Sequence, residues 1–406
     1  MKKILFIAET SSIHAAKWIN QLKGTDWDVY VFQPQMKIRA IHPEFQPTKF
    51  FFPFRIKTKQ TIVRSFLPFD WGIANAIWSA SLVKKLFPHA YTKFLVKTIR
   101  DLEPDIIHSL GLNVNWTNIC SIMFEAKKAL GRKFKTPWVY STWGSDLDYY
   151  ARIDKNNYKE VSKIMRQCDY QLAECKRDKD LARKMGFKGE FLGNFPGGGG
   201  LVKSQITKHK SLLPPSKRKN ILIKGRDNNC PNCDPIGRAM VALKAIELSQ
   251  DYLKGYHIYI FQPSENVSQY VQKLQRETDL DITLLPFVSY DKLLSIMGKS
   301  RLFISITIND GLPNSLVEAM TLGVFPIHSN LDSLDEWIRH NKTGLLVPPE
   351  DINKTAKAIQ KALGDDNLVD IAQRLNADLV DAKLTNQVVR PRVLTMYEEI
   401  LKKEGK

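Results

Sequence analysis

The sequence predicts an α/β protein built from two doubly wound domains, each a parallel sheet covered by helices on both faces. Three observations carry this prediction. The chain has 406 residues, which exceeds the length at which a single hydrophobic core usually stops growing. Short apolar runs bounded by turns alternate with longer helical patterns along the whole chain. A stretch rich in glycine, proline, serine and lysine interrupts this alternation near the middle.

Twelve apolar runs are the expected strands. They read KILFIAE, DVYVFQP, PDIIHSLG, WVYSTWG, YQLAEC and GEFLGNF in the first half, and NILIKGR, HIYIFQP, ITLLPFV, RLFISIT, VFPIHSN and TGLLVPP in the second. We predict an N-terminal domain over 1–196, a linker over 197–219 and a C-terminal domain over 220–387, with a C-terminal helix at about 388–406 that packs back on the first domain. Ligands of such sheets bind outside the carboxyl ends of the strands, so functional residues are expected there.

The composition excludes several classes of protein. With 43% hydrophobic and 25% charged residues, the chain resembles neither a disordered nor a fibrous protein. The apolar run near the start is short and is broken by Glu9, unlike a secretory signal or a membrane span. The five cysteines are an odd number in a large chain, which does not indicate a disulfide framework. These observations predict a cytoplasmic protein with reduced thiols.

The charge predicts an anionic partner. Sixty Lys and Arg residues against 42 Asp and Glu give a formal net charge of +18. Nucleic acid, an anionic lipid surface and a phosphorylated small molecule are the three candidate classes. No zinc-finger, basic-zipper or aromatic RNA-binding motif is found in the sequence, so nucleic acid is not the expected partner.

Residues 306–320, ITINDGLPNSLVEAM, place two carboxylates around a tight turn. The pattern predicts a strand, a turn at NDG, and a helix that begins near Pro313. Asp310 then lies at the carboxyl end of the strand, and the first amides of the helix, at Gly311 and Leu312, form an anion site. From spacing alone, an equally good interpretation makes Asp310 a helix cap and Glu318 a solvated residue.

The stretch DGLPNSLVEAMTLGVFP, residues 310–326, resembles the signature of the retaining family-4 glycosyltransferases with the GT-B fold. In that family two glutamates separated by seven residues flank a Gly-x-Pro turn, followed by Glu-Ala-Met and a further Gly-x-Pro. The resemblance extends more weakly over nearly the whole chain. It implies two Rossmann-like domains that face a cleft, and sugar transfer from a nucleoside diphosphate sugar without a metal or other cofactor.

The resemblance assigns roles to the residues of this motif. Glu318 matches the glutamate that hydrogen-bonds the ribose of the sugar nucleotide. Asp310 matches the glutamate beside the transferred sugar and is therefore a catalytic candidate. Aspartate is one methylene shorter, which bears on its reach and on the choice of sugar. The amides of Gly311 and Leu312 would contact the phosphates between these two groups.

The family's phosphate site has Gly-Arg after the first strand of the second domain and a lysine about five residues later. Gly225 and Arg226 match this pattern, whereas Pro231 occupies the position of the lysine. Arg238, at the start of the next helix, is expected to replace it, with Lys224 as a less favoured alternative. Two cations beside the leaving diphosphate would stabilise its developing charge, although either arginine could be an ordinary surface residue.

Three further segments are compared with the family. Phe287 and Val288 fall where the family's backbone meets the nucleobase, or they are plain strand-end packing. In ETSSIHAAKW, Ser12 would contact the donor phosphate and His14 the acceptor, in place of a glycine-rich loop; alternatively, His14 packs against the sheet. In WVYSTWGSDLDYY, Trp143 stands where the family often has histidine. Asp146 either orients the acceptor hydroxyl or caps a helix.

Two motifs receive plainer interpretations. The CPNC of Cys230 and Cys233 could be a redox motif or half a zinc site, but no second cysteine or histidine pair accompanies it, so two loop thiols and no metal are predicted. The GGGG of residues 197–200 could cradle a phosphate; a hinge linker is favoured because no helix follows it.

The sequence therefore predicts a retaining hexosyltransferase-type glycosyltransferase of cell-envelope glycan synthesis, with a lipid-linked or polysaccharide acceptor. Residues 49–100 interleave basic and aromatic residues, which suits the inner face of an anionic membrane near the acceptor entrance, or else provides core aromatics and solvated lysines. Two alternatives stay open: a non-catalytic GT-B scaffold that binds a nucleotide or glycan, and a nucleic-acid-binding protein.

Overall fold

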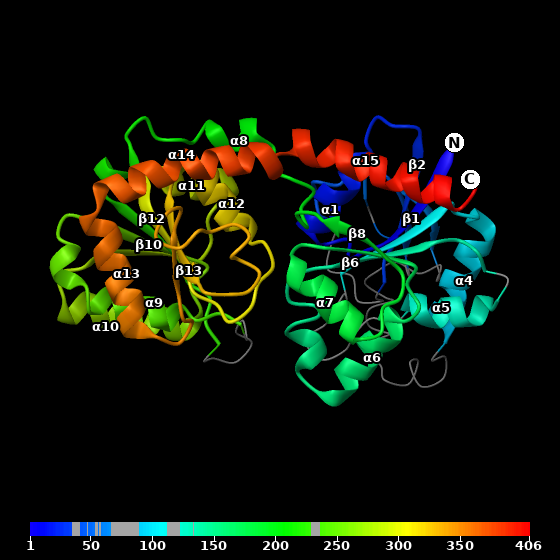
Figure 1. Cartoon of the computed structure of the whole chain (residues 1–406), viewed down its shortest axis with the longest axis horizontal. Coiled ribbons are helices and arrows are strands. Elements are labelled where there is room, and N and C mark those ends of the chain that lie inside the picture. The colour runs from blue at the N-terminus through cyan, green and yellow to red at the C-terminus, as the bar shows by residue number, and fades with distance from the viewer. Residues whose placement is uncertain are drawn as a thin grey trace. The chain divides into compact units, whose positions relative to one another are not determined.

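The structure is a computed structural model that describes residues 1–34, 41–46, 48–52, 56, 58–65, 89–111, 122–132, 134–228 and 236–406 (Figure 1). These residues divide into two compact units, one of residues 1–200 with 389–406 and one of residues 201–388. Each unit is a parallel sheet with helices packed on it, which confirms the predicted fold class.

The first unit contains an eight-stranded parallel sheet in the order β4-β3-β2-β1-β5-β6-β7-β8. Its strands are β1 (Lys2–Ile7), β2 (Trp27–Phe32), β3 (Lys49–Phe52), β4 (Thr61–Ser65), β5 (Ile106–Leu110), β6 (Trp138–Thr142), β7 (Tyr170–Ala173) and β8 (Glu190–Asn194). Its helices include α1 (Ile13–Ile19), α4 (Ala90–Leu102), α5 (Ile122–Leu130), α6 (Lys155–Met165), α7 (Lys176–Lys184) and most of α15 (Asn386–Lys403). The strand order reverses between β1 and β5.

The alternation of side chains along β1 explains why helices cover both faces of this sheet. Ile4 and Phe6 belong to one hydrophobic cluster, which includes residues of α1 and α15. Leu5 and Ile7 belong to a second cluster, which includes residues of α4, α5, α6 and α7. Successive side chains of a strand point to opposite faces, so a strand apolar at every position needs cover on both sides.

A chain of buried polar groups joins the C-terminal helix to the centre of the first unit. The indole N–H of Trp18 donates to the hydroxyl of Tyr397 at 3.0 Å. That hydroxyl lies 2.6 Å from Nδ1 of His108, whose Nε2 lies 2.6 Å from the hydroxyl of Ser141. Burial lowers the pKa of His108 to about 3, so the ring is neutral at pH 7. We infer that Tyr397 donates to Nδ1 and that the proton on Nε2 is donated to Ser141.

The second unit contains a six-stranded parallel sheet in the order β11-β10-β9-β12-β13-β14. Its strands are β9 (Asn220–Lys224), β10 (His257–Phe261), β11 (Asp281–Leu285), β12 (Ser300–Ser305), β13 (Phe325–Ser329) and β14 (Leu345–Val347). Its helices are α8 (Lys203–Thr207), α9 (Ala239–Glu247), α10 (Glu265–Glu277), α11 (Tyr290–Gly298), α12 (Asn314–Thr321), α13 (Ile352–Gly364) and α14 (Asp366–Lys383). Ile221 and Ile223 pack toward α9, α10 and α13, whereas Leu222 packs toward α11 and α12.

Two segments differ from what the sequence predicts. Strands β3 and β4 were not expected; Phe50 and Phe52 are fully buried, so the aromatic residues at the start of 49–100 are core residues. Residues 66–88 of that region lie outside the described residues. Residues 201–219, expected as linker, belong to the second unit. There the guanidinium of Arg218, 2% exposed, donates to the carbonyls of Leu213, Ser300 and Leu322.

Replacing Arg301 by alanine is expected to destabilise the second unit strongly. Its side chain is 1% exposed, pairs with Asp366 at 2.7 Å and donates to three backbone carbonyls, one of them in Ser216. Removing it leaves the buried carbonyls of Ser216 and Ala362 without this donor, which costs about 3–5 kcal/mol in free energy of unfolding. Urea unfolding measures the loss. The control is Lys217→Ala, which removes an exposed partner of the same Asp366 and should cost less than about 1 kcal/mol. Equal losses would contradict this prediction.

Candidate functional site

The loop after β12 contains the first predicted site residue. Asp310 is half-buried; its Oδ1 accepts the N–H of Gly311 at 2.9 Å, and its carbonyl accepts the hydroxyl of Ser333 at 2.7 Å. Gly311 and Leu312 are buried, and α12 starts two residues later. The N-cap of α12 is Pro313, and no side chain caps this helix. Asp310 is therefore fixed beside the entrance of the helix without being its cap.

Glu318 lies in the middle of α12 and is not solvated. The residue is 7% exposed, and its Oε1 accepts the hydroxyl of Tyr290 at 2.6 Å. Tyr290 is the first residue of α11 and directly follows the segment that contains Phe287 and Val288. Phe287 is 96% exposed and Val288 is half-buried. The structure thus brings the predicted base-contacting segment and the predicted ribose-contacting residue into one neighbourhood, through Tyr290.

Gly225 and Arg226 follow β9. A Cβ on Gly225 would lie 2.7 Å from a side-chain carbon of Ile260 and 2.8 Å from Cα of Pro263, so no larger residue fits there without a shift. Arg226 is exposed, and its Nε donates to the side chain of Gln262 at 3.0 Å. Its side chain therefore lies at the surface beside the carboxyl end of β9.

Arg238 is bound within the protein. Its side chain is 13% exposed, its Nε lies 2.5 Å from Oε1 of Glu350, and a terminal nitrogen donates to the carbonyl of Gly237 at 2.7 Å. A phosphate would have to share this guanidinium with the carboxylate of Glu350. Pro231, Cys230 and Cys233 lie outside the described residues. Within the described ranges, no group of three or more His, Cys, Asp and Glu side chains could hold a metal ion.

Sequence analysis missed a row of polar residues across three neighbouring strands. Ser305 of β12 pairs in register with His328 of β13, and Lys224 of β9 is level with Ser305 because Ile223 pairs with Ile304. Neighbours in register point to the same face of a parallel sheet. The row lies at the carboxyl ends of β9 and β12 and one residue before the end of β13. The strand order reverses between β9 and β12, and ligands bind at this position in such sheets.

Two members of this row are buried without hydrogen-bond partners. The hydroxyl of Ser305 and both ring nitrogens of His328 have none among the described residues, and His328 is 0% exposed. Burial, and then the positive charge of Lys224, lower the pKa of His328 to about 3. A sequence signal existed: the runs ILIK, LFIS and FPIH each end in one polar residue at the equivalent position.

The buried histidine predicts a loss of stability in mild acid. His328 is neutral when folded but titrates near its ordinary value when unfolded, so its contribution is complete above about pH 6.5 and is lost as pH falls toward about 3. Between pH 7.5 and 5.0 it should remove about 2 kcal/mol from the free energy of unfolding. His328→Leu is similar in volume and cannot be protonated, so its urea midpoint should fall less than that of the wild type. An equal fall in both proteins would contradict the prediction.

In the first unit, Ser12 and His14 lie at the start of α1. Ser12 is the N-cap, and its hydroxyl accepts the N–H of Ala15 at 3.3 Å. The ring of His14 lies 5.8 Å from the ring of Trp143, edge to face. Burial, followed by the charge of Lys17, lowers the pKa of His14 to about 4, so it is neutral at pH 7. The structure therefore places His14 beside the segment after β6, which contains Asp146, the second acceptor candidate.

Asp146 shapes that segment. It is 7% exposed, and its Oδ2 accepts the N–H of Trp143 at 2.8 Å, so it holds the turn that places the tryptophan. Glu174, which sequence analysis did not single out, accepts the N–H of Gly144 at 2.8 Å. A Cβ on Gly197 would lie 2.1 Å from Oε1 of Glu174, so the first glycine of GGGG packs against this carboxylate. Residues 197–200 belong to the first unit and do not form a free linker.

Comparison with known proteins finds a family model that matches most of the second unit. Residues 204–377 match the family model described as Glycosyl transferases group 1. The segment contains Arg226, Asp310 and Glu318 in the arrangement described above. Most of the second unit is therefore similar to a glycosyl transferase group 1 domain. The capsular polysaccharide biosynthesis glycosyltransferase CapM of Staphylococcus aureus is 26% identical to the chain over 114 residues, which are 28% of this chain and 30% of that protein. The match therefore spans less than a third of the curated relative.

Solved structures resemble the chain in fold over nearly its whole length. Sucrose-phosphate synthase from Thermosynechococcus elongatus has a TM-score of 0.70 at 14% identity, over 99% of this chain and 100% of its own. Anabaena Alr3699/HepE, solved with UDP and glucose, has a TM-score of 0.67 at 14% identity, over 98% of this chain and 100% of its own. The group 1 domain thus belongs to a chain with the GT-B class of fold, as the sequence predicts.

Proposed function

We propose that the protein is a retaining glycosyltransferase that moves a sugar from a nucleoside diphosphate sugar to a hydroxyl of a glycan acceptor. The observation that carries the proposal is the loop and helix from Asp310 to Glu318 within the group 1 domain. A half-buried carboxylate, the backbone of Gly311 and Leu312, and a buried carboxylate follow one another from the carboxyl end of β12. Sugar, diphosphate and ribose are presented in the same order along a sugar nucleotide.

The donor in this proposal is a uridine diphosphate sugar. HepE was solved with UDP-glucose, and the pneumococcal O-GlcNAc transferase GtfA with UDP and GlcNAc. In this chain, Phe287 and Val288 would contact the base and Glu318 would accept hydrogen bonds from the ribose hydroxyls. The choice of glucose, N-acetylglucosamine or another hexose would depend on Asp310, which contacts the sugar.

Diphosphate departure would be assisted by cations. Arg226 would contact the diphosphate directly, since its guanidinium is exposed beside Gly225. We propose Lys224 as the second cation, ahead of Arg238, because Arg238 already pairs with Glu350 and Lys224 has no ion-pair partner among the described residues. Positive groups beside the leaving phosphate stabilise its developing charge, so the reaction would proceed without a metal. The departing phosphate oxygen would take the proton of the attacking hydroxyl, and no separate base is required.

The acceptor would be a polysaccharide or a lipid-linked glycan. CapM is named for capsular polysaccharide biosynthesis, which agrees with this proposal. His14 and Asp146 would lie on the acceptor side, His14 by contact and Asp146 by holding the Trp143 turn. No helix in the described part of the chain is long and apolar enough to cross a membrane. A cytoplasmic location, and association with the inner face of an anionic membrane, stay predictions.

A thermal-shift panel tests the proposed donor. UDP, UDP-glucose and UDP-N-acetylglucosamine are compared with GDP, dTDP and ADP sugars. A ligand at about 100 times its dissociation constant adds roughly 2.7 kcal/mol of stability, so a true donor should raise the melting temperature measurably. A shift with the uridine compounds alone supports the assignment. No rise in melting temperature with any compound of the panel would overturn the assignment.

Retention and catalysis need a second assay. With an α-linked UDP-sugar, proton NMR of the product should show an α-linkage, and a β-linkage would overturn the retaining mechanism. A non-catalytic scaffold is the second candidate function, because Asp310 is shorter than the family's glutamate and Arg238 is engaged by Glu350. Saturable binding of UDP-sugars with neither transfer nor donor hydrolysis would favour the scaffold.

A further inference from the structure

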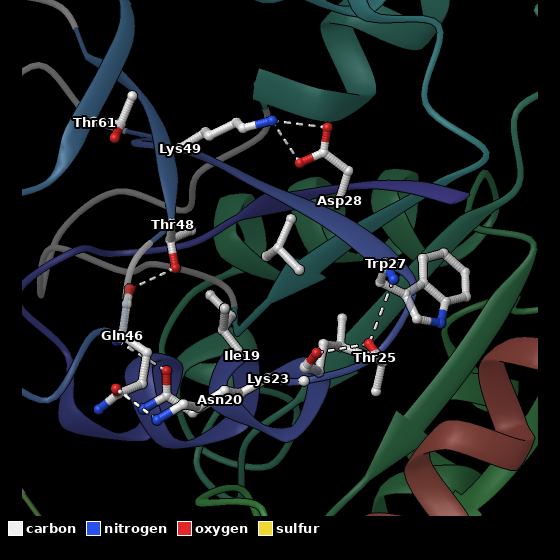
Figure 2. Close-up of a pocket in the computed structure, with 13 residues that line it drawn as sticks. Ile19, Asn20, Lys23, Thr25, Trp27, Asp28, Gln46, Thr48, Lys49 and Thr61 are labelled. Atoms are coloured by element: carbon white, nitrogen blue, oxygen red, sulfur yellow. Dashed lines mark hydrogen bonds and ion pairs between the residues drawn. The ribbon is translucent and has the colours of Figure 1, made fainter. Parts of the chain in front are cut away.

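Two of the basic cavities on the first unit differ in whether their cations are already paired. The pocket in Figure 2 has a volume of about 370 Å³ and is lined by residues near the amino ends of β2 and β3. Its lysines have partners: Lys49 lies 2.7 Å from the carboxylate of Asp28, and Lys23 donates to Gln46 at 3.1 Å. Because these groups satisfy one another, this pocket offers little unpaired charge to a ligand.

The second cavity is a groove of about 780 Å³ between α4 and α5, which pack against each other. Four cationic and two acidic side chains line it, together with His89, Thr92, Val96 and Ala129; the charged ones are Lys93, Lys97, Arg100, Lys128, Asp101 and Glu125. Among the described residues, Lys93, Arg100 and Lys128 have no ion-pair partner, and all three are exposed.

The acidic residues do not neutralise this groove. Asp101 is held by Arg64 of β4 and by Lys97, which lies 3.3 Å from it, and hydrogen bonds from these two cations lower its pKa. Of the two carboxylates that line the groove, only Glu125 then remains to offset the charge of the three unpaired cations. The groove therefore keeps an excess of positive charge at neutral pH, and attraction for an anion extends about a Debye length into solution.

The cations form a line. Lys93, Lys97 and Arg100 follow one another at intervals of four and three residues on α4, so they lie along one face of the helix and extend over about 10 Å. Lys128 of α5 faces the same groove. A line of charge in a recess fits a linear polyanion, whose anionic groups can each meet a cation.

We propose that this α4–α5 groove binds the anionic part of a glycan chain, such as a phosphate- or sulfate-bearing polysaccharide. A membrane surface is a poorer fit. Surfaces that insert into headgroups carry exposed aromatic or aliphatic side chains beside their cations. The apolar residues that line this groove are Val96 and Ala129. Alanine is small, and Val96 is 9% exposed and forms part of the core. The proposal rests on the proposed function, because it makes the acceptor an anionic glycan.

The test uses the full chain with dextran sulfate as the probe and uncharged dextran as its control. In the groove variant, Lys93→Ala, Arg100→Ala and Lys128→Ala are combined. The matched control combines Lys155→Ala, Lys159→Ala and Lys184→Ala, which removes three exposed cations from α6 and α7. Both triple variants change net charge equally and place alanine in helices, where it is well tolerated.

Binding is measured by fluorescence anisotropy at low and high salt. The wild type should bind dextran sulfate, and more weakly at high salt, while uncharged dextran does not bind. The dissociation constant for dextran sulfate should be about tenfold or more higher in the groove variant than in the wild type, and less than about twofold higher in the control variant. No binding by the wild type, or equal weakening in both triple variants, would overturn the proposal.

Vesicles distinguish the membrane alternative. Flotation with phosphatidylglycerol and phosphatidylcholine vesicles should show the same binding for the wild type and the groove variant. If the groove variant loses vesicle binding as much as dextran sulfate binding, the surface is a membrane site and the glycan assignment fails. The melting-temperature shift with UDP should be the same in the wild type and both triple variants. Absence of the shift in the wild type would reject the proposed uridine diphosphate donor, and the result for the groove would remain valid.

Discussion

Asp310→Asn is expected to lower kcat for sugar transfer by at least about 100-fold, while the affinity for UDP stays close to that of the wild type. Asparagine has the same size and can still accept the N–H of Gly311 through its side-chain oxygen, a bond of 2.9 Å in the wild type. What it lacks is the negative charge beside the sugar, where positive charge develops as the bond to the diphosphate breaks. Rates are measured with saturating donor, and affinity by calorimetry with UDP.

Two further variants sharpen this prediction. Asp332→Asn removes an exposed carboxylate from the loop after β13 and should leave transfer unchanged. Asp310→Glu restores the family's residue and adds one methylene. If reach toward the sugar decides donor choice, this variant should keep transfer but change the ratio of rates with UDP-glucose and UDP-N-acetylglucosamine. Transfer by Asp310→Asn at the wild-type rate would rule out its catalytic role.

Glu318→Ala is expected to weaken UDP binding by about 10- to 100-fold, which corresponds to the loss of one or two hydrogen bonds to a carboxylate. The residue is 7% exposed, so water compensates poorly for the missing acceptor. Tyr290→Phe removes the hydroxyl that lies 2.6 Å from Glu318 but keeps the carboxylate, and should weaken binding much less. Calorimetry measures the affinity for UDP in the wild type, Glu318→Ala and Tyr290→Phe.

A nucleotide lacking ribose hydroxyls shows whether Glu318 acts where we propose. The wild type should bind 2′-deoxy-UDP or 3′-deoxy-UDP more weakly than UDP, whereas Glu318→Ala should bind the affected deoxy compound and UDP alike. The difference between the two proteins isolates the contact between the carboxylate and the ribose. If both proteins lose the same affinity on removal of either hydroxyl, Glu318 does not contact the ribose.

The fold was largely predictable because its signals are local. Each of the twelve expected runs contains a strand of the structure, or all of that strand except its first residue, since parallel strands buried on both faces are apolar at nearly every position. Strands β3 and β4 were missed. For KFFF, sequence analysis left open a basic, aromatic surface and core aromatics, and TIVRS is largely exposed at the edge of the sheet. Neither segment shows a pattern that distinguishes a short edge strand from a loop.

The candidate site was predictable only in part. The motif from Asp310 to Glu318 is continuous in sequence, so its order along the loop and helix follows from helix geometry. Arg238 illustrates the limit. Its position suggested a phosphate contact, but the side chain reaches Glu350, which is 112 residues away in sequence. An ion pair between distant residues leaves no local pattern, so the sequence could not show that this cation was engaged.

By itself, the sequence determined the two parallel α/β units and the presence of a carboxylate motif at the end of the strand RLFISIT, because apolar periodicity and turn chemistry act over a few residues. The tertiary structure decided which polar groups meet. It aligned Lys224, Ser305 and His328 across β9, β12 and β13, and it packed Gly197 against Glu174. These contacts join segments more than 20 residues apart. They depend on strand register and on the close approach of backbone segments, which only the folded chain determines.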